Sequence, residues 1–250
     1  ERPMRLFVAT LCLLSASAWA DPAAWHVSGS TGEAWLLGSI HYLREQDYPL
    51  PPVIDDLYQR ADTLVMELDL DDLDLAAVQG SFMSAGVLPA STTLRTVLDP
   101  EIYELTESRA KELGLPITLL ERLEPWLVAL TLMDLGMSRL GYQANRGVEQ
   151  YLLRRSVAEG REILGLESLE DQVGIFDTLS WADQEAMLLQ TLTDLEAPDE
   201  KMTQLLNAWR EGSLDKLATE LSSDFDEFPE LEAALVGARN QRWAVQLEKL

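Results

Sequence analysis

The sequence of 250 residues contains little cysteine and little histidine. Its one cysteine, Cys12, lies in an N-terminal segment that we expect to be removed, so no disulfide can form in the mature chain. The two histidines are His26 and His41. These counts exclude a cysteine nucleophile and a zinc site built from several histidines.

Basic residues are also scarce. The chain has 19 Lys and Arg against 43 Asp and Glu, which gives a formal net charge of −24. Nucleic acid and anionic membrane surfaces are repelled by such a charge, so we expect neither as a partner, whereas cations and basic polypeptides are favoured. A simpler explanation is that the charge keeps an exported protein in solution, and we favour it over a binding role for the charge itself.

Apolar runs long enough to span a membrane are lacking. The N-terminal apolar stretch covers residues 6–14, far short of the roughly 20 residues that a spanning helix needs. It follows Arg2 and Arg5 and ends in small residues up to Ala20, which is typical of a signal peptide cleaved after Ala20. We therefore expect residues 1–20 to be a signal peptide and residues 21–250 to form a single periplasmic or secreted domain, with no stable membrane insertion after cleavage.

The pattern of apolar residues predicts both strands and helices. Residues 24–39 read as a β-hairpin, and residues 63–68 and 162–167 as compact apolar strands. Helical periodicity is found in segments 53–58, 100–113, 124–135 and 148–159, and almost without interruption in 181–250, with breaks near 197–198, 212 and 228–229. We predict an α/β fold: a mixed central sheet with an N-terminal hairpin, covered by many helices.

Polar residues stand at the ends of three of the predicted strands. His41 follows the second hairpin strand, and Gly38 before it permits close backbone approach. Glu67 and Glu167 each follow apolar residues, and burying such a carboxylate without a partner is costly. If the imidazole and the carboxylates meet, as ligands do at the carboxyl ends of strands, they suit manganese, iron or zinc better than a soft metal. The alternatives are an ordinary loop histidine and glutamates that reach solvent.

Other polar and aromatic features have structural explanations. His26 lies in an edge-like strand and is expected at the surface. The residues Trp126, Trp209 and Trp243 occur at helical spacings and are expected in the core. The acidic run 67–74 is better explained as a solvated loop than as a cation site.

Several motifs in order along the chain carry a family resemblance. They are Trp35-Leu36-Leu37-Gly38-Ser39-Ile40-His41, Val65-Met66-Glu67, Glu124-Pro125-Trp126, Leu164-Gly165-Leu166-Glu167-Ser168-Leu169-Glu170-Asp171-Gln172 and Arg239-Asn240. With these motifs the chain resembles the TraB/GumN/PrgY-like proteins, which are related to the Tiki ectodomains. The resemblance implies a sheet-centred α/β fold related to erythromycin esterase and haem-binding ChaN-like proteins and, for Tiki-like members, a metal-dependent peptidase.

The resemblance also implies roles for particular residues. It assigns metal or catalytic roles to His41 and Glu67, a ligand or base role to Glu167, and places Gly38, Arg239 and Asn240 in the polar surround of the site. The implied cofactor is a divalent cation of the manganese, iron, cobalt or zinc class. The family pattern has a second Gly-x-x-His after the Arg-Asn helix, which this sequence lacks. We therefore expect a chain cut short in its C-terminal part, with an exposed sheet edge.

Three hypotheses for function follow. The first is a metal-dependent hydrolase of peptidase type that acts on peptides or proteins outside the cytoplasm. The second is a non-catalytic periplasmic binding protein that sequesters a peptide signal or haem in the same pocket. The third is a structural protein associated with export, favoured only if no pocket forms around His41.

Overall fold

The strands form two small sheets. The computed structural model describes residues 22–29, 32–222 and 229–249, so the expected signal peptide lies outside the described residues. The strands are β1 (Ala24–Ser28), β2 (Glu33–Leu37), β3 (Thr63–Leu68) and β4 (Glu162–Glu167). Strands β1 and β2 form an antiparallel hairpin, and β3 and β4 form a parallel pair. The helix-covered α/β class is confirmed, and within the described residues the strands are divided between two sheets.

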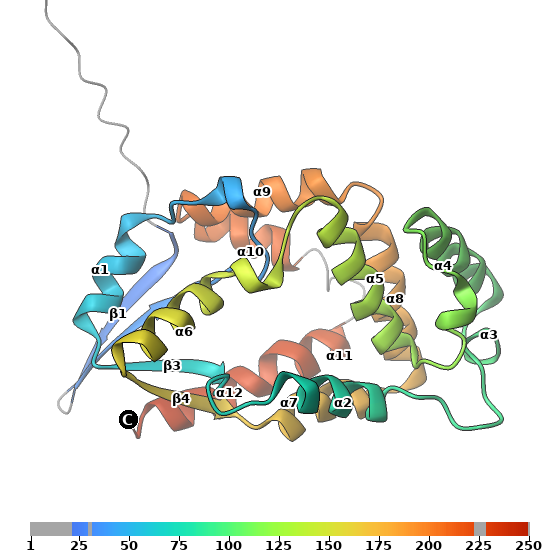
Figure 1. Ribbon diagram of the computed structural model, residues 1–250, viewed down its shortest axis with the longest axis horizontal. Helices are drawn as coiled ribbons and strands as arrows, with labels where there is room; N and C mark the ends of the chain where they lie inside the picture. The colour runs from blue at the N-terminus through green and yellow to red at the C-terminus, as the bar shows by residue number, and fades with distance from the viewer. Residues whose placement is uncertain (1–21, 30–31, 223–228, 250) are drawn as a thin grey trace, which may run out of the picture.

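Helices make up most of the fold (Figure 1). The α-helices are α1 (Pro52–Arg60), α2 (Leu75–Ala85), α3 (Leu94–Val97), α4 (Pro100–Glu112), α5 (Pro125–Arg139), α6 (Val148–Glu159), α7 (Leu169–Asp177), α8 (Trp181–Asp194), α9 (Pro198–Arg210), α10 (Leu214–Ser222), α11 (Pro229–Glu232) and α12 (Ala238–Leu247). Short 3₁₀ segments are η1 (Glu45–Asp47), η2 (Ile117–Leu119) and η3 (Ala144–Arg146), and η4 (Ala233–Gly237) is a π-helix. Through the described part of the chain, none of the helices has both the length and the apolar composition that crossing a membrane requires.

Helix α6 shows how local sequence sets the bounds of an element. It begins directly after Gly147 and ends at Gly160, which adopts the left-handed conformation with φ 64°. The N–H of Arg161 then donates to the carbonyl of Ser156 at 2.9 Å and closes the last turn. The predicted helix 148–159 is therefore confirmed. Helices α2 and α7 were not predicted, since α2 has a weak apolar periodicity and α7 spans only nine residues.

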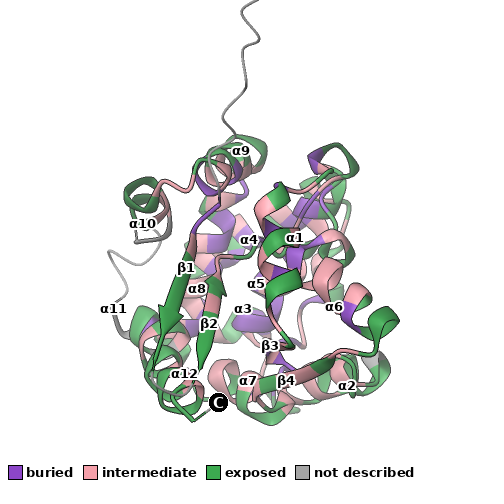
Figure 2. Ribbon diagram, turned by 90° about the vertical axis from the view of Figure 1, so that its left-hand side faces the viewer, coloured by how far each residue is buried: buried purple, intermediate pink, exposed green. Residues whose placement is uncertain are grey.

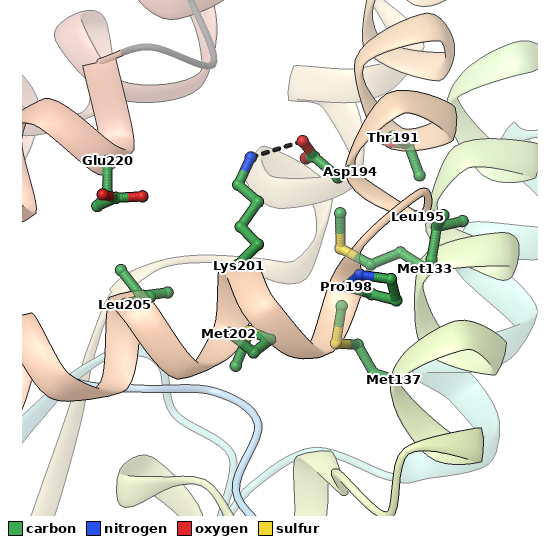
Figure 3. A pocket seen from close by; sticks show the side chains of 10 residues that line it. All are labelled: Met133, Met137, Thr191, Asp194, Leu195, Pro198, Lys201, Met202, Leu205 and Glu220. Atoms are coloured by element: carbon green, nitrogen blue, oxygen red, sulfur yellow. Dashed lines mark hydrogen bonds and ion pairs between the residues drawn. The ribbon is translucent and has the colours of Figure 1, made fainter.

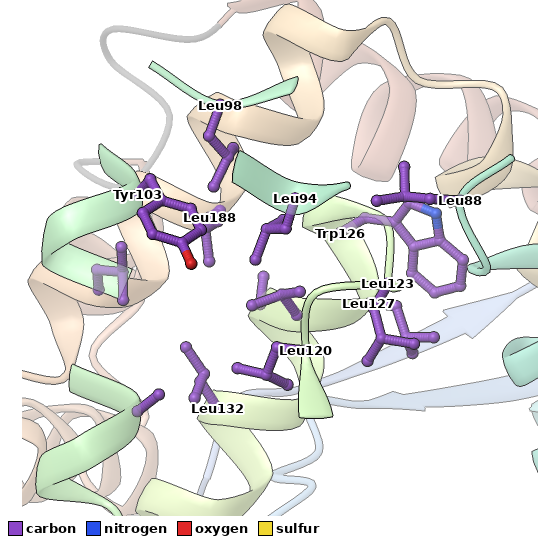
Figure 4. Close-up of a cluster of buried hydrophobic side chains, with 14 of the residues drawn as sticks. Leu88, Leu94, Leu98, Tyr103, Leu120, Leu123, Trp126, Leu127, Leu132 and Leu188 are labelled. Atoms are coloured by element: carbon purple, nitrogen blue, oxygen red, sulfur yellow. The ribbon is translucent and has the colours of Figure 1, made fainter. Parts of the chain in front are cut away.

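Two apolar clusters hold the helices together. The larger one surrounds the fully buried Trp126 between α5 and α8, and Figure 4 shows the leucines that pack there. The second cluster includes Ile40, Leu43 and the 2 % exposed Trp209, so it lies directly beneath the loop that carries His41. The burial predicted for Trp126 and Trp209 is confirmed. Trp243 is only partly buried, because it lies on α12, whose described residues include none that is fully buried (Figure 2).

Candidate functional site

The loop from Gly38 to His41 is fixed by backbone hydrogen bonds. The N–H of Gly38 donates to the carbonyl of Ala23 at 2.8 Å and extends the hairpin by one residue pair. The carbonyl of Gly38 accepts from the indole of Trp209 at 2.6 Å, and the carbonyl of Ile40 accepts from the N–H of Val148 at 3.0 Å. The loop is therefore tied to α9 and to the start of α6, while the His41 side chain stays 67 % exposed.

A carboxylate from α6 supports the imidazole of His41. The Nδ1 atom lies 2.9 Å from Oε1 of Glu149, whose side chain is only 21 % exposed, and the hydroxyl of Ser39 donates to the same oxygen. Hydrogen bonding to Glu149 raises the pKa of His41 against the opposing effect of partial desolvation. Burial also acts to raise the pKa of Glu149, but its hydrogen bonds to His41 and Ser39 lower that pKa on balance. A proton on Nδ1 satisfies this contact and leaves the Nε2 lone pair for chemistry.

Arg239 of α12 joins the two predicted carboxylates. Since β3 and β4 are parallel neighbours with Leu68 opposite Glu167, their carboxyl ends meet. The Nη2 atom of Arg239 lies 2.6 Å from Oε2 of Glu67 and 2.8 Å from Oε2 of Glu167, and its Nε lies 3.0 Å from Oε1 of Glu167. The Glu167 side chain is 2 % exposed and that of Arg239 is 15 % exposed. The structure thus brings Glu67 and Glu167 together around a guanidinium.

His41 lies within electrostatic reach of this cluster. The charge of Glu67 acts to raise the pKa of His41, and the charge of Arg239 acts to lower it. Among the described residues neither of these side chains contacts the imidazole directly. Asn240 is exposed and has no hydrogen-bond partner within the described ranges. His26 is at the surface as expected, where its Nε2 lies 3.3 Å from a carboxylate oxygen of Glu33.

The arrangement does not fit a divalent cation held between Glu67 and Glu167. The position between their oxygens is taken by the guanidinium of Arg239, which already supplies the positive charge. Residues 22–29, 32–222 and 229–249 contain no group of three or more His, Cys, Asp or Glu side chains that could hold a metal ion. A catalytic cation usually takes three protein ligands. The Nε2 of His41 and the Oε1 of Glu67 have no described partner, which is one ligand fewer than such a cation usually takes.

Two contributors to the site were not predicted from the sequence. Glu149 supports His41, and the only sequence signal for it is an acidic residue in the first turn of a helix that follows glycine. The side-chain amide of Gln172 donates to Glu67 Oε2 at 3.3 Å. Gln172 belongs to one of the motifs that carry the family resemblance, but nothing in its spacing indicates a contact with β3.

Gly147 permits the close approach between the His41 loop and α6. A Cβ atom at this position would lie 2.4 Å from the carbonyl oxygen of His41. We therefore expect Gly147→Ala to lower the free energy of unfolding by about 1–3 kcal/mol, because backbone must move to make room. The matched control is Gly174→Ala in α7, where an added Cβ meets nothing within 4 Å and we expect no loss. Urea unfolding of the two variants measures the difference, and equal midpoints would contradict it.

A separate cavity of about 160 Å³ lies among α5, α8, α9 and α10 (Figure 3). It is lined mainly by apolar side chains, including Met133, Met137 and Met202, and the ion pair between Lys201 and Asp194 lies at it. None of the residues of the His41 site lines this cavity. The candidate site is therefore a surface at the strand ends and not this apolar cavity.

The fold and the site define a helix-covered α/β protein with an imidazole–carboxylate pair beside a carboxylate–guanidinium cluster. The chain belongs to the TraB/PrgY/gumN family, which it matches over residues 23–250. It is 24% identical over 216 residues to the uncharacterized protein YbaP of Escherichia coli, covering 86% of this chain and 77% of that protein. It is 27% identical over 165 residues to an uncharacterized protein of Treponema pallidum, covering 66% of this chain and 48% of that protein. No solved structure matches the chain significantly.

Proposed function

We propose that this protein is a hydrolase acting on peptides or proteins outside the cytoplasm, with His41 as its general base. The observation that carries the proposal is the 2.9 Å contact between His41 Nδ1 and Glu149, combined with an imidazole that is 67 % exposed. A carboxylate on one ring nitrogen fixes the tautomer and orientation of the ring, so the other nitrogen is ready to accept a proton. The peptide class of substrate rests on the resemblance to Tiki-like proteins, and the location rests on the signal-peptide pattern of residues 1–20.

The proposed reaction is the attack of water on a peptide carbonyl. Nε2 of His41 takes one proton from water as the oxygen bonds to the carbonyl carbon, and Glu149 stabilises the imidazolium that forms. When the C–N bond breaks, the same proton passes from Nε2 to the leaving amine. Glu67, Glu167, Arg239 and Arg242 together carry no net charge beside the imidazole. The net charge of −24 of the whole chain favours neutral or basic substrates over acidic ones.

A cleavage assay with and without metal tests the proposal. The purified chain is incubated with fluorescence-quenched peptides of mixed sequence, after chelation and again with added manganese, cobalt or zinc, and the products are identified by mass spectrometry. Cleavage after chelation is the result expected of a general base that acts alone. Cleavage only with an added cation would contradict the role of His41 as a general base, and His41 Nε2 and Glu67 Oε1 would then be the atoms available to hold the cation. An absence of cleavage in every condition would contradict the proposal.

One observation favours a binding protein as the second candidate. Because Arg239 occupies the position between Glu67 and Glu167, the described residues leave fewer ligands than a catalytic cation usually takes. A non-catalytic protein that sequesters a peptide signal or haem at the same surface needs no such ligand set. Peptide binding that is retained without turnover, or a haem absorbance band that is lost in His41→Ala, would support this candidate instead.

The pH dependence of hydrolysis follows from the contact with Glu149. A general base works in its neutral form, and the pKa of His41 is raised above its usual value of 6.5. We therefore expect kcat/KM to be low at acidic pH and to rise as pH passes through this raised pKa, above about pH 6.5. In Glu149→Gln the main cause of the raised pKa is removed, so the midpoint should move to lower pH. A kcat/KM profile of both proteins measures the midpoints, and identical midpoints would show that Glu149 does not act on the base.

A further inference from the structure

Each outer edge of the two-stranded β-hairpin carries a row of backbone groups without a described partner, and the row on β2 is the one that continues toward His41. The N–H of Gly38 donates to the Ala23 carbonyl, and that of Gly29 donates to the Gly32 carbonyl, which fixes the phase of the antiparallel ladder. Hydrogen-bonded and non-hydrogen-bonded pairs alternate along such a ladder, so the hydrogen-bonded pairs within the strands are 25–36 and 27–34. The N–H and C=O groups of residues 33, 35 and 37 therefore point away from β1. No described residue hydrogen-bonds to them.

This unpaired edge leads into the candidate site. In both views β2 is the hairpin strand on the side of the β3–β4 sheet (Figures 1 and 2). From Leu37 the chain reaches His41 within a span of at most about 14 Å. A strand that paired with β2 would thus run along the molecule toward the imidazole of His41, next to the ends of β3 and β4.

The side chains of the hairpin supply a complementary surface. Residues paired across the strands share a face, so Trp25, Val27, Ala34 and Leu36 form one apolar face. All are exposed, Trp25 by 45%, Val27 by 51% and Leu36 by 41%. Exposed apolar surface beside an unpaired edge is a site at which an extended peptide can add a strand.

We propose that the outer edge of β2 binds the peptide substrate as an added β-strand and so presents it to His41. This inference rests on the proposed hydrolase function. The backbone of the peptide pairs with Glu33, Trp35 and Leu37, and its alternate side chains extend the apolar face that contains Leu36. The net charge of −24 adds an attraction for basic residues at the remaining positions of the peptide, whose side chains point to the opposite face. The substrate class is therefore an extended segment in which apolar and basic residues alternate.

Substitutions at Trp35 separate the backbone of β2 from its side chain. Binding of fluorescein-labelled Lys-Val-Lys-Val-Lys-Val-Lys is measured by fluorescence anisotropy in full-length His41→Ala protein, so that turnover does not interfere. Proline at position 35 removes an outward N–H without removing a hydrogen bond to β1, as edge strands tolerate. Trp35→Ala removes the same indole and keeps the N–H. We expect Trp35→Pro to weaken binding at least about tenfold relative to Trp35→Ala, and equal affinities, or no binding of the peptide to the parent protein, would overturn the proposal.

A second measurement does not depend on how Trp35→Pro folds. The same peptide is made with a single N-methyl group at each position in turn and tested on the His41→Ala protein. An added strand predicts that methylation at alternate positions abolishes binding while methylation between them has little effect, because only every second N–H points at β2. A uniform effect would overturn the proposal. A second result would also overturn the proposal: a wild-type dimer in analytical sedimentation that dissociates in Trp35→Pro. The edge of β2 would then pair with a second copy of the chain.

The outcomes for the edge and for the hydrolase can be told apart. If the wild-type protein cleaves peptides while Trp35→Pro and Trp35→Ala bind the labelled peptide with equal affinity, only the edge proposal is overturned. The alternating pattern of N-methyl effects without cleavage by the wild type would support the edge as a peptide site and overturn hydrolysis. Cleavage together with the alternating pattern is the result that we expect.

Discussion

Replacing His41 with alanine should lower kcat for peptide hydrolysis by about 10²–10⁴-fold, the contribution usual for a positioned general base. The imidazole combines an exposed ring nitrogen with a partly buried carboxylate partner, Glu149, at 2.9 Å. Its removal leaves the carboxylates of Glu67 and Glu167 ion-paired with Arg239. Steady-state kinetics on a cleaved peptide measures the loss, and KM should change much less than kcat.

The control for this prediction is the other histidine. His26→Ala removes an imidazole of similar exposure that contacts a carboxylate at 3.3 Å, but on the hairpin strand that lies farther from the β3–β4 sheet. We expect its kcat to stay within about twofold of the wild type, because His26 contacts Glu33 and stacks on Trp35 in the hairpin and makes no described contact with His41 or Glu149. A His41→Ala enzyme as active as His26→Ala would remove His41 from the mechanism.

The strands and helices that surround the site could be predicted from the sequence because each is marked by a local pattern of residues. The predicted strands 63–68 and 162–167 and the predicted helix 148–159 coincide with β3, β4 and α6. Each has an apolar pattern of the right period, and α6 also has glycines at both of its ends. The sequence left open whether Glu67 and Glu167 meet. The structure brings them together because β3 and β4 are parallel neighbours, whose carboxyl ends lie at one edge of the sheet.

The partners of those residues could not be read in the same way. Arg239 contacts Glu167 from a position 72 residues further along the sequence. Glu149 accepts a hydrogen bond from the hydroxyl of Ser39, which precedes it by 110 residues. Such contacts depend on how α12 and α6 pack on the strands, which no local pattern specifies. The division of the strands into two sheets is of the same kind, since strand pairing is decided by the packing of distant segments. The resemblance placed Arg239 near the site, and the structure shows it between the two carboxylates.

Replacing Arg239 with alanine should destabilise the protein by about 3–5 kcal/mol, the usual cost of leaving a buried charge without its partner. Glu167, with a side chain only 2 % exposed, accepts hydrogen bonds from both Nε and Nη2 of Arg239. The pKa of Arg239 is depressed by burial, but its hydrogen bonds to Glu167 and Glu67 outweigh that effect and raise it overall, so the guanidinium stays charged. Urea unfolding followed by circular dichroism gives the difference in the free energy of unfolding.

Arg242→Ala is the matched control, because it removes an arginine from the same helix that approaches the same carboxylate. Its Nη2 lies 3.5 Å from Glu167 Oε1 and its side chain is 52 % exposed, so we expect a loss of no more than about 1 kcal/mol. Adding Glu167→Gln to Arg239→Ala should restore part of the stability, since a neutral amide is less costly to bury than a carboxylate. If Arg239→Ala and Arg242→Ala were equally stable, the guanidinium would not be what holds the two strand ends together, and the space between Glu67 and Glu167 would be open to another cation.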